Sequence, residues 1–165
     1  MASEATRKAL IDALERETTT TLKVLNAYPA AQSELRPHPV AKTARELAWL
    51  FTMEQMLATA AVRGELDLSV AFPPAPATIP EVIATFDRSR RDLVELLRSG
   101  PAELLDGTVH FFTGPKQMGD IPKPEFLWFL VHDQIHHRGQ FSVYLRMAGG
   151  KVPSIYGPTA DEPWF

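Results

Sequence analysis

Fourteen prolines divide this chain into segments, and their placement constrains the fold more than any other feature of the sequence. A proline inside a helix removes a backbone hydrogen bond and clashes with the preceding turn, so helices form between prolines. Four long windows contain no proline, namely residues 1–28, 40–72, 81–100 and 125–152. The pattern predicts four helices.

Each window also carries apolar residues at helical spacing and residues suited to helix ends. Ser3 and Thr78 are expected to cap the first and third helices, because their hydroxyl groups can accept a backbone N–H. Gly64 and Gly100 are expected to end the second and third helices. The fourth helix is expected from about Lys123 to Met147.

The segments between the windows are long and irregular. Residues 65–79 and 101–122 are expected to be loops, and residues 150–165 a C-terminal tail without regular structure. Thr108–Thr113 comes nearest to the alternation of a strand, but it is short and is also expected to be a loop. Four amphipathic helices can bury one another, so the sequence predicts an all-α, four-helix bundle in a single domain, residues 1–165.

Composition excludes several classes of function. Apolar residues make up 45% of the chain and the net charge is −3, which indicates a globular protein without the basic excess of most nucleic-acid binders. The chain has no cysteine, so a reaction of a thiol would need a thiol carried by a small molecule. Its longest apolar run, Phe126–Val131, is far shorter than the roughly 20 residues of a membrane span. Without a signal sequence near its N-terminus, the protein is expected to be cytoplasmic.

His132 and His136 are the first candidates for chemistry. They lie four residues apart in the fourth predicted helix, so both imidazoles project from one face at a spacing that suits a transition metal. A stripe that contains both is expected to point into the bundle; its members are Phe129, His132, His136, Val143 and Met147. Such a pair can equally be solvated or hydrogen-bonded, so the spacing alone leaves metal binding open.

Glu54 is the second candidate, because it interrupts an apolar stripe of the second predicted helix. A buried carboxylate needs a cation or hydrogen-bond donors. Glu54 either forms a salt bridge with an arginine or faces His132 and His136, as a third ligand or as a partner that orients them. His137 and Arg138 are expected on another face of their helix, where they line the rim or pair with acidic residues such as Asp133 or Asp161.

Two stretches of the sequence resemble the DinB-like (DinB/YfiT) superfamily of four-helix proteins. They are RPHPVAKTARELAW at 36–49 and LVHDQIHHRGQFSVYLRMAGGKVPSIYGPTADE at 130–162. The resemblance implies a divalent metal, often nickel or zinc, held by three histidines, two of which match His132 and His136. The third should follow ELAW, where this chain has Leu50. Glu54, one turn later, is then the best substitute, and His38 is a distant second.

The resemblance also bears on function. Some members of this superfamily are thiol-dependent transferases or isomerases, which implies a metal-dependent transferase or hydrolase acting on a small molecule. Leu50, Gln140 and Tyr144 are expected to line its pocket. A homodimer is expected from the family and from the apolar run Phe126–Val131. The alternative is a non-catalytic binding or structural bundle that has lost its metal, and the leucine at position 50 keeps it open.

Overall fold

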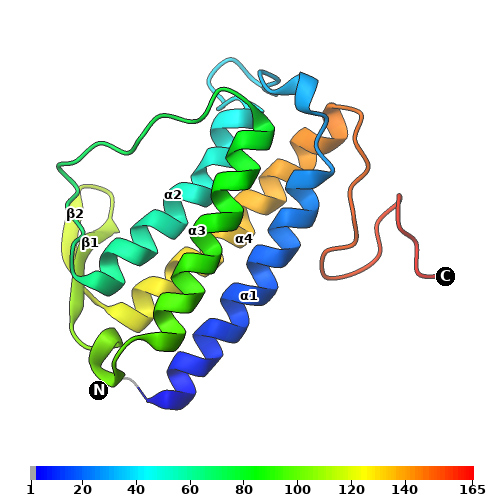
Figure 1. Ribbon diagram of the computed structural model, residues 1–165. Helices are drawn as coiled ribbons and strands as arrows, with labels where there is room; N and C mark the ends of the chain where they lie inside the picture. Colours follow the sequence, from blue (N-terminus) through cyan, green and yellow to red (C-terminus); the bar gives the residue numbers. More distant parts are fainter. Residues whose placement is uncertain (1–2) are drawn as a thin grey trace.

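The four expected helices form in the computed structural model, which describes residues 3–165. They are α1 (Glu4–Asn26), α2 (Ala44–Arg63), α3 (Ile79–Ser99) and α4 (Lys123–Met147) (Figure 1).

The predicted helix ends are confirmed. The Ser3 hydroxyl accepts the backbone N–H of Thr6, and the Thr78 hydroxyl caps α3 as part of a reciprocal capping box. Gly64 ends α2 in the left-handed conformation, with φ of 73°, which glycine adopts without steric cost. Two short 3-10 helices, η1 (Ala30–Gln32) and η2 (Ala102–Leu105), lie in the connections.

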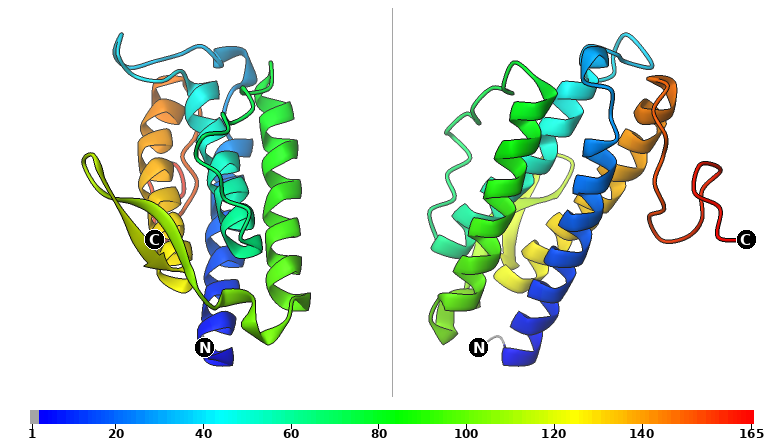
Figure 2. Two further views of the ribbon diagram at one scale, coloured as in Figure 1. Left: turned by 90° about the vertical axis from the view of Figure 1, so that its left-hand side faces the viewer. Right: turned by 45° about the vertical axis from the view of Figure 1, so that its right-hand side comes forward.

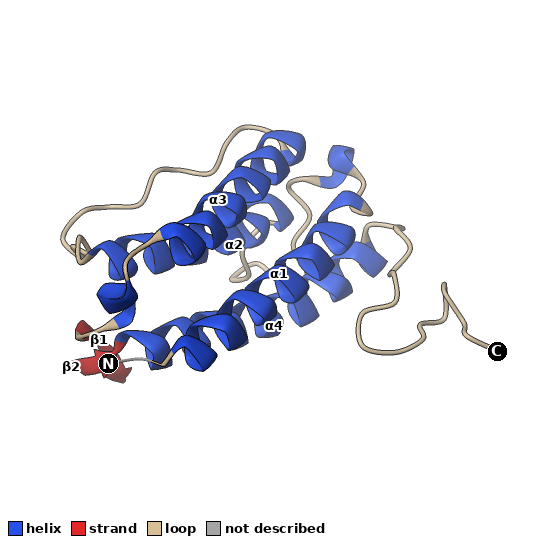
Figure 3. Cartoon of the chain, turned by 60° about the horizontal axis from the view of Figure 1, so that its bottom comes forward, coloured by secondary structure: helices blue, strands red, loops and turns tan. Residues whose placement is uncertain are grey.

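The helices form two layers, α2 with α3 and α1 with α4 (Figure 3). Each helix packs against two others: α1 and α2 both contact α3 and α4. Figure 1 shows that α2 and α3 run in the same direction, because residues 64–78 return the chain along the length of the bundle. In the part of the chain that the structure describes, no helix is long and apolar enough to cross a bilayer.

The expectation of a loop at Thr108–Thr113 is wrong. This segment belongs to β1 (Thr108–Gly114), which pairs with β2 (Gln117–Pro122) as an antiparallel hairpin beside α4 (Figure 2). A single short strand carries little alternation to detect, and the hairpin is stabilised by its contacts with a helix. On β1, the ring of Phe111 lies 4.9 Å from that of Phe126 of α4.

This hairpin explains the apolar start of α4. Of the run Phe126–Val131, four residues are buried, and Phe126 packs against the hairpin as well as the core. Phe129 alone is largely exposed, at 45%. Most of the apolar surface on which the expectation of a homodimer was based is therefore covered within the chain.

The interior consists of two apolar clusters with a polar layer between them. On each of α1, α2 and α4, the polar positions lie between residues of one cluster and residues of the other. The hydroxyl of Thr21 donates to Oε1 of Gln134 across the α1–α4 contact, at 3.3 Å. The buried polar residues of this layer are Glu17, Thr18, Thr21, Thr52, Glu54, Gln55, Gln134 and Arg138.

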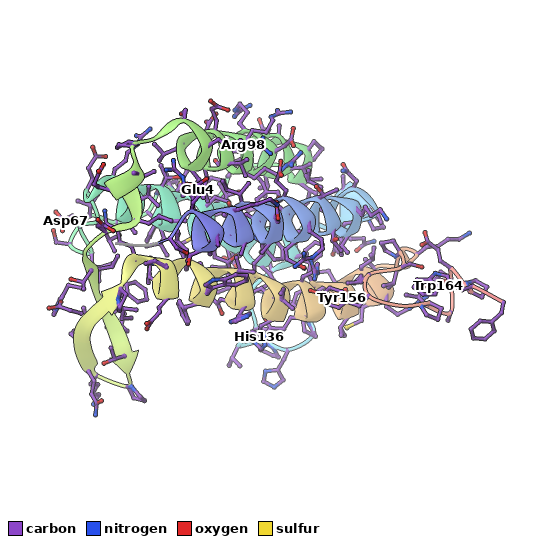
Figure 4. The ribbon with its side chains drawn as sticks, turned by 90° about the horizontal axis from the view of Figure 1, so that it is seen from below. Glu4, Asp67, Arg98, His136, Tyr156 and Trp164 are labelled. Carbon is purple, nitrogen blue, oxygen red and sulfur yellow. The ribbon has the colours of Figure 1, made fainter. Side chains whose placement is uncertain are left out.

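Arg138 and Glu17 form a buried ion pair in this layer. Arg138 is 1% exposed, and its Nη2 donates to Oε2 of Glu17 at 2.8 Å. Tyr156 of the C-terminal tail, labelled beside α4 in Figure 4, covers the pair and lies 2.6 Å from both groups. Although burial raises the pKa of Glu17, hydrogen bonds from Tyr156 and Arg138 outweigh it and hold that pKa below its usual value. The pair connects α1, α4 and the tail.

The variant Glu17→Gln should therefore unfold more easily at neutral pH, by about 3 kcal/mol, because it leaves the Arg138 guanidinium buried without a counter-charge. A lowered pKa stabilises the fold above the ordinary glutamate range and loses that effect as Glu17 protonates. The difference between wild type and variant should accordingly shrink in acid. Urea denaturation over a range of pH measures both effects.

Glu15→Gln is the matched control, because Glu15 forms an exposed ion pair with Arg98. Such a pair contributes under about 1 kcal/mol. Equal destabilisation by the two variants would contradict the role of the buried pair.

Candidate metal centre

Glu54 lies in the middle of α2 and is 4% exposed. Its Oε1 is 2.7 Å from Nδ1 of His137 on α4, which is within hydrogen-bond distance. Its Oε2 is buried and has no hydrogen-bond partner in the part of the chain that the structure describes. A carboxylate in this position therefore has half of its hydrogen-bonding capacity unused.

Asp133 completes a group of three potential ligands. It lies one turn before His137 on α4, and its Oδ2 is 3.8 Å from Nδ1 of His137. One ligand atom from each of Glu54, Asp133 and His137 lies within 4.8 Å of the other two. Among residues 3–165, this is the group of three acidic or histidine side chains placed to hold an ion.

The structure places His132 and His136 elsewhere. Both are exposed, and Figure 4 shows His136 on the side of α4 turned away from α1. The expectation that they point into the bundle is wrong. Neither alternative for Glu54 holds, because its partner is His137 rather than an arginine or the pair His132 and His136. Nε2 of His136 instead accepts a hydrogen bond of 2.9 Å from the Gln140 amide.

The rotation of α4 accounts for this arrangement. Successive residues of a helix are 100° apart, so neighbours in sequence can face two neighbouring helices of a bundle. Arg138 faces Glu17 of α1, and His137, one residue earlier, faces Glu54 of α2. A further step of 100° turns His136 to solvent. Phe129, Val143 and Met147, the apolar members of the predicted stripe, are exposed on this side too.

Burial and pairing set the protonation of the two central groups. Burial raises the pKa of Glu54 to about 7, in spite of the hydrogen bond and charge of His137, which lower it. The hydrogen bond to Glu54 raises the pKa of His137, against the effect of its own burial. A bound cation would compete with protons at both groups.

A pocket of about 550 Å³ adjoins this group between α2, α4 and the residues that precede α2. His137 lies in its wall, together with Leu50, Gln140 and Tyr144, which are the three pocket residues that the sequence analysis named. The structure thus brings these three together beside His137. The hydroxyl of Tyr144 donates to the backbone carbonyl of Lys42 at 3.0 Å.

Sequence reasoning missed Asp133 and His137 as ligands, although their spacing was available. The segment HDQIHH contains two pairs at i and i+4, His132 with His136 and Asp133 with His137. Periodicity alone does not decide which pair faces inward, because both are polar. His38, the distant second choice, is exposed and lies in none of the potential ligand groups of residues 3–165.

Solved structures of similar fold come from bacilli. A DinB-like protein from Bacillus cereus ATCC 10987 superposes with a TM-score of 0.74 over 90% of this chain and 97% of its own, at 23% identity. The DinB-like protein YjoA from Bacillus subtilis gives 0.70 over 89% and 97%, at 17% identity. YfiT from Bacillus subtilis, described as a probable metal-dependent hydrolase with an unusual four-helix bundle topology, gives 0.65 over 92% of each chain, at 14% identity. At these identities the comparison concerns the fold.

A sequence relative is similar over a shorter segment. The uncharacterized protein YrdA of Bacillus subtilis strain 168 is 50% identical over 42 residues, which are 26% of this chain. The match spans about a quarter, 25%, of the length of YrdA. The similarity is therefore local.

The sequence matches the DinB family over residues 1–163, which is nearly the full length of this chain. The match agrees with the four-helix fold and with the structures it resembles. The chain belongs to the DinB family.

Proposed function

We propose that this DinB-family protein is a metal-dependent hydrolase or transferase that acts on a small molecule, and that Glu54, Asp133 and His137 hold its divalent ion. The unpartnered Oε2 of the buried Glu54 is the observation that carries the proposal, because it lies beside an imidazole and a second carboxylate. The description of YfiT as a probable metal-dependent hydrolase supports it.

The three side chains fit a divalent transition metal. One imidazole with two carboxylates is a donor set that zinc accepts, and a site with three protein ligands leaves a position for water or substrate. Two anionic oxygens would also offset the charge of the ion in this half-buried place. Nickel or zinc is therefore the proposed cofactor.

When bound, an ion of this kind would lower the pKa of a coordinated water or thiol to a value near neutral pH. The chain itself contributes the surroundings. Leu50 and Val143 give one side of the pocket an apolar surface, and Tyr144 fixes the backbone at Lys42. Because the chain has no cysteine, a thiol reactant would arrive with a small molecule. We propose that the protein acts in the cytoplasm and has no nucleic-acid partner.

The variants His137→Ala and Glu54→Gln should lose bound zinc and nickel. Each removes a ligand from the buried group, and loss of one ligand or its orienting partner weakens binding by at least about 10–100-fold. Metal content of protein purified without a histidine tag, with calorimetric titration of Zn²⁺, measures the effect.

The matched control is the double variant His132→Ala/His136→Ala, which removes two exposed imidazoles from the same helix. It should bind the first equivalent of zinc as wild type does. Loss of that equivalent in the control, with retention in His137→Ala, would contradict the assignment and favour the exposed histidine pair.

The variant Leu50→His should tighten metal binding. Leu50 lines the pocket together with His137 and lies one turn before Glu54 on α2, so an imidazole there can add a nitrogen ligand. A lower Kd for Zn²⁺ by calorimetry is the expected result. An unchanged Kd would show that residue 50 does not reach the ion.

A non-catalytic bundle is the second candidate function. The observation that favours it is the hydrogen bond between Glu54 and His137, which compensates part of the burial of both groups without an ion. In that case Glu54→Gln would lower stability, and wild-type protein would bind no zinc at micromolar concentrations. Thermal unfolding beside the zinc titration separates the two candidates.

Homodimerisation stays a prediction. The hairpin covers the start of α4, but Phe129, Val143 and Met147 are exposed on the face of α4 that carries His132 and His136. Sedimentation at micromolar concentrations should give twice the mass of 18.4 kDa. A monomer would contradict the expectation.

A further inference from the structure

We propose that the pocket beside Glu54, Asp133 and His137 selects small organic anions with an apolar body, and that Lys42 and Arg36 attract their negative charge. The proposal names the substrate class for the proposed function and rests on it. It is carried by the lining of the pocket and by the charges at its mouth.

The walls of the pocket are mainly apolar. Leu47 and Leu50 of α2 face Val143 of α4, and Ala41 continues this surface toward the loop before α2. A volume of about 550 Å³ lies within the range that small-molecule sites occupy. Burial of an apolar group against these side chains would provide the non-directional part of binding. A small polar metabolite would not bury this apolar surface and would gain little from it.

The charges at the mouth are positive. Lys42 lines the pocket, and Arg36 precedes it in the same loop. Burial raises the pKa of the Tyr144 phenol, while the charge of Arg36 lowers it and that of Glu46 raises it. Neither cation has a carboxylate within ion-pair distance in residues 3–165. Both are therefore available to a ligand.

One acidic group, Glu46, lies within electrostatic range of both cations: the backbone hydrogen bond from Thr43 lowers its pKa, and the charges of Arg36 and Lys42 lower it further. Oε2 of Glu46 accepts the backbone N–H of Thr43 at 2.7 Å in the capping box of α2. Asp133 and Glu54 do not line the pocket, as Lys42 does, and both lie against His137 instead. Two cations thus stand against this one carboxylate, and the excess of positive charge favours an anion over a cation or a neutral molecule.

Tyr144 fixes the backbone at Lys42, one of the two cations. Its hydroxyl proton is used in the hydrogen bond to the Lys42 carbonyl, so this phenol can offer a ligand only an acceptor. The Gln140 amide likewise donates to His136. Gln140 uses one of its two amide N–H groups on His136, so recognition of a negative group at the mouth depends on the other N–H together with Lys42 and Arg36.

The test uses three probes of equal length, hexanoate, hexanol and hexylamine, titrated into metal-free and zinc-loaded protein. Methyl NMR signals of Leu47, Leu50 and Val143 report occupation of the pocket. Hexanoate should bind most tightly of the three in the metal-free protein, where no ion can coordinate its carboxylate, and added salt should weaken it.

The variant Lys42→Gln should weaken hexanoate about three- to fivefold and leave hexanol unchanged, since one exposed cation contributes an effect of this size. A double variant that also carries Arg36→Gln should weaken it about tenfold. Lys23→Gln is the matched control, because Lys23 is an exposed lysine on α1, which does not border the pocket. It should leave all three affinities unchanged.

Equal affinities for the three probes, tighter binding of hexylamine, or no effect of Lys42→Gln would each overturn the proposal. Methyl signals that do not move with any probe would overturn it as well. Failure of the metal centre is distinguished by zinc titration of the same protein: selective binding of hexanoate without zinc binding would reject the proposed function and leave the anion pocket.

Discussion

Desolvation of the Glu54 carboxylate governs how the middle of this bundle is built. An unpaired carboxylate loses its hydration in such a place, and the loss costs several kcal/mol unless donors or a cation replace the water. His137 supplies one hydrogen bond, and Oε2 has no hydrogen-bond partner among residues 3–165. Asp133 adds a second negative group nearby rather than a donor. A divalent cation would satisfy all three groups together.

The site is supported by the two apolar clusters on either side of the polar layer. They fix α2 and α4 against each other above and below Glu54. The buried pair of Arg138 with Glu17 sets the rotation of α4 against α1, and the 100° step between adjacent residues then turns His137 toward α2. One polar segment of α4 thus serves stability on one side and the proposed chemistry on the other.

Much of the fold could be predicted from the sequence, because its signals are local. Prolines and capping residues mark the ends of helices regardless of tertiary contacts, and Lys123–Met147 begins and ends where the sequence predicts. The hairpin could not be predicted in the same way, since it depends on packing against Phe126, which is distant from most of β1 in sequence. The family resemblance agreed with the bundle that the proline windows and the apolar spacing predict.

The candidate site was predicted in part. Glu54 stood out because a charge on an apolar stripe is unusual, and Leu50, Gln140 and Tyr144 do line one pocket. The inward pair on α4 was misassigned, since the rotation of that helix depends on a partner in α1 that no local pattern identifies.

Anomalous diffraction from crystals of the zinc-loaded protein tests the central claim most directly. The account predicts a zinc peak within bonding distance, about 2.0–2.2 Å, of a carboxylate oxygen of Glu54 and a ring nitrogen of His137, with Asp133 as the third ligand. A peak bound by His132 and His136 on the exposed face, with none beside Glu54, would contradict it.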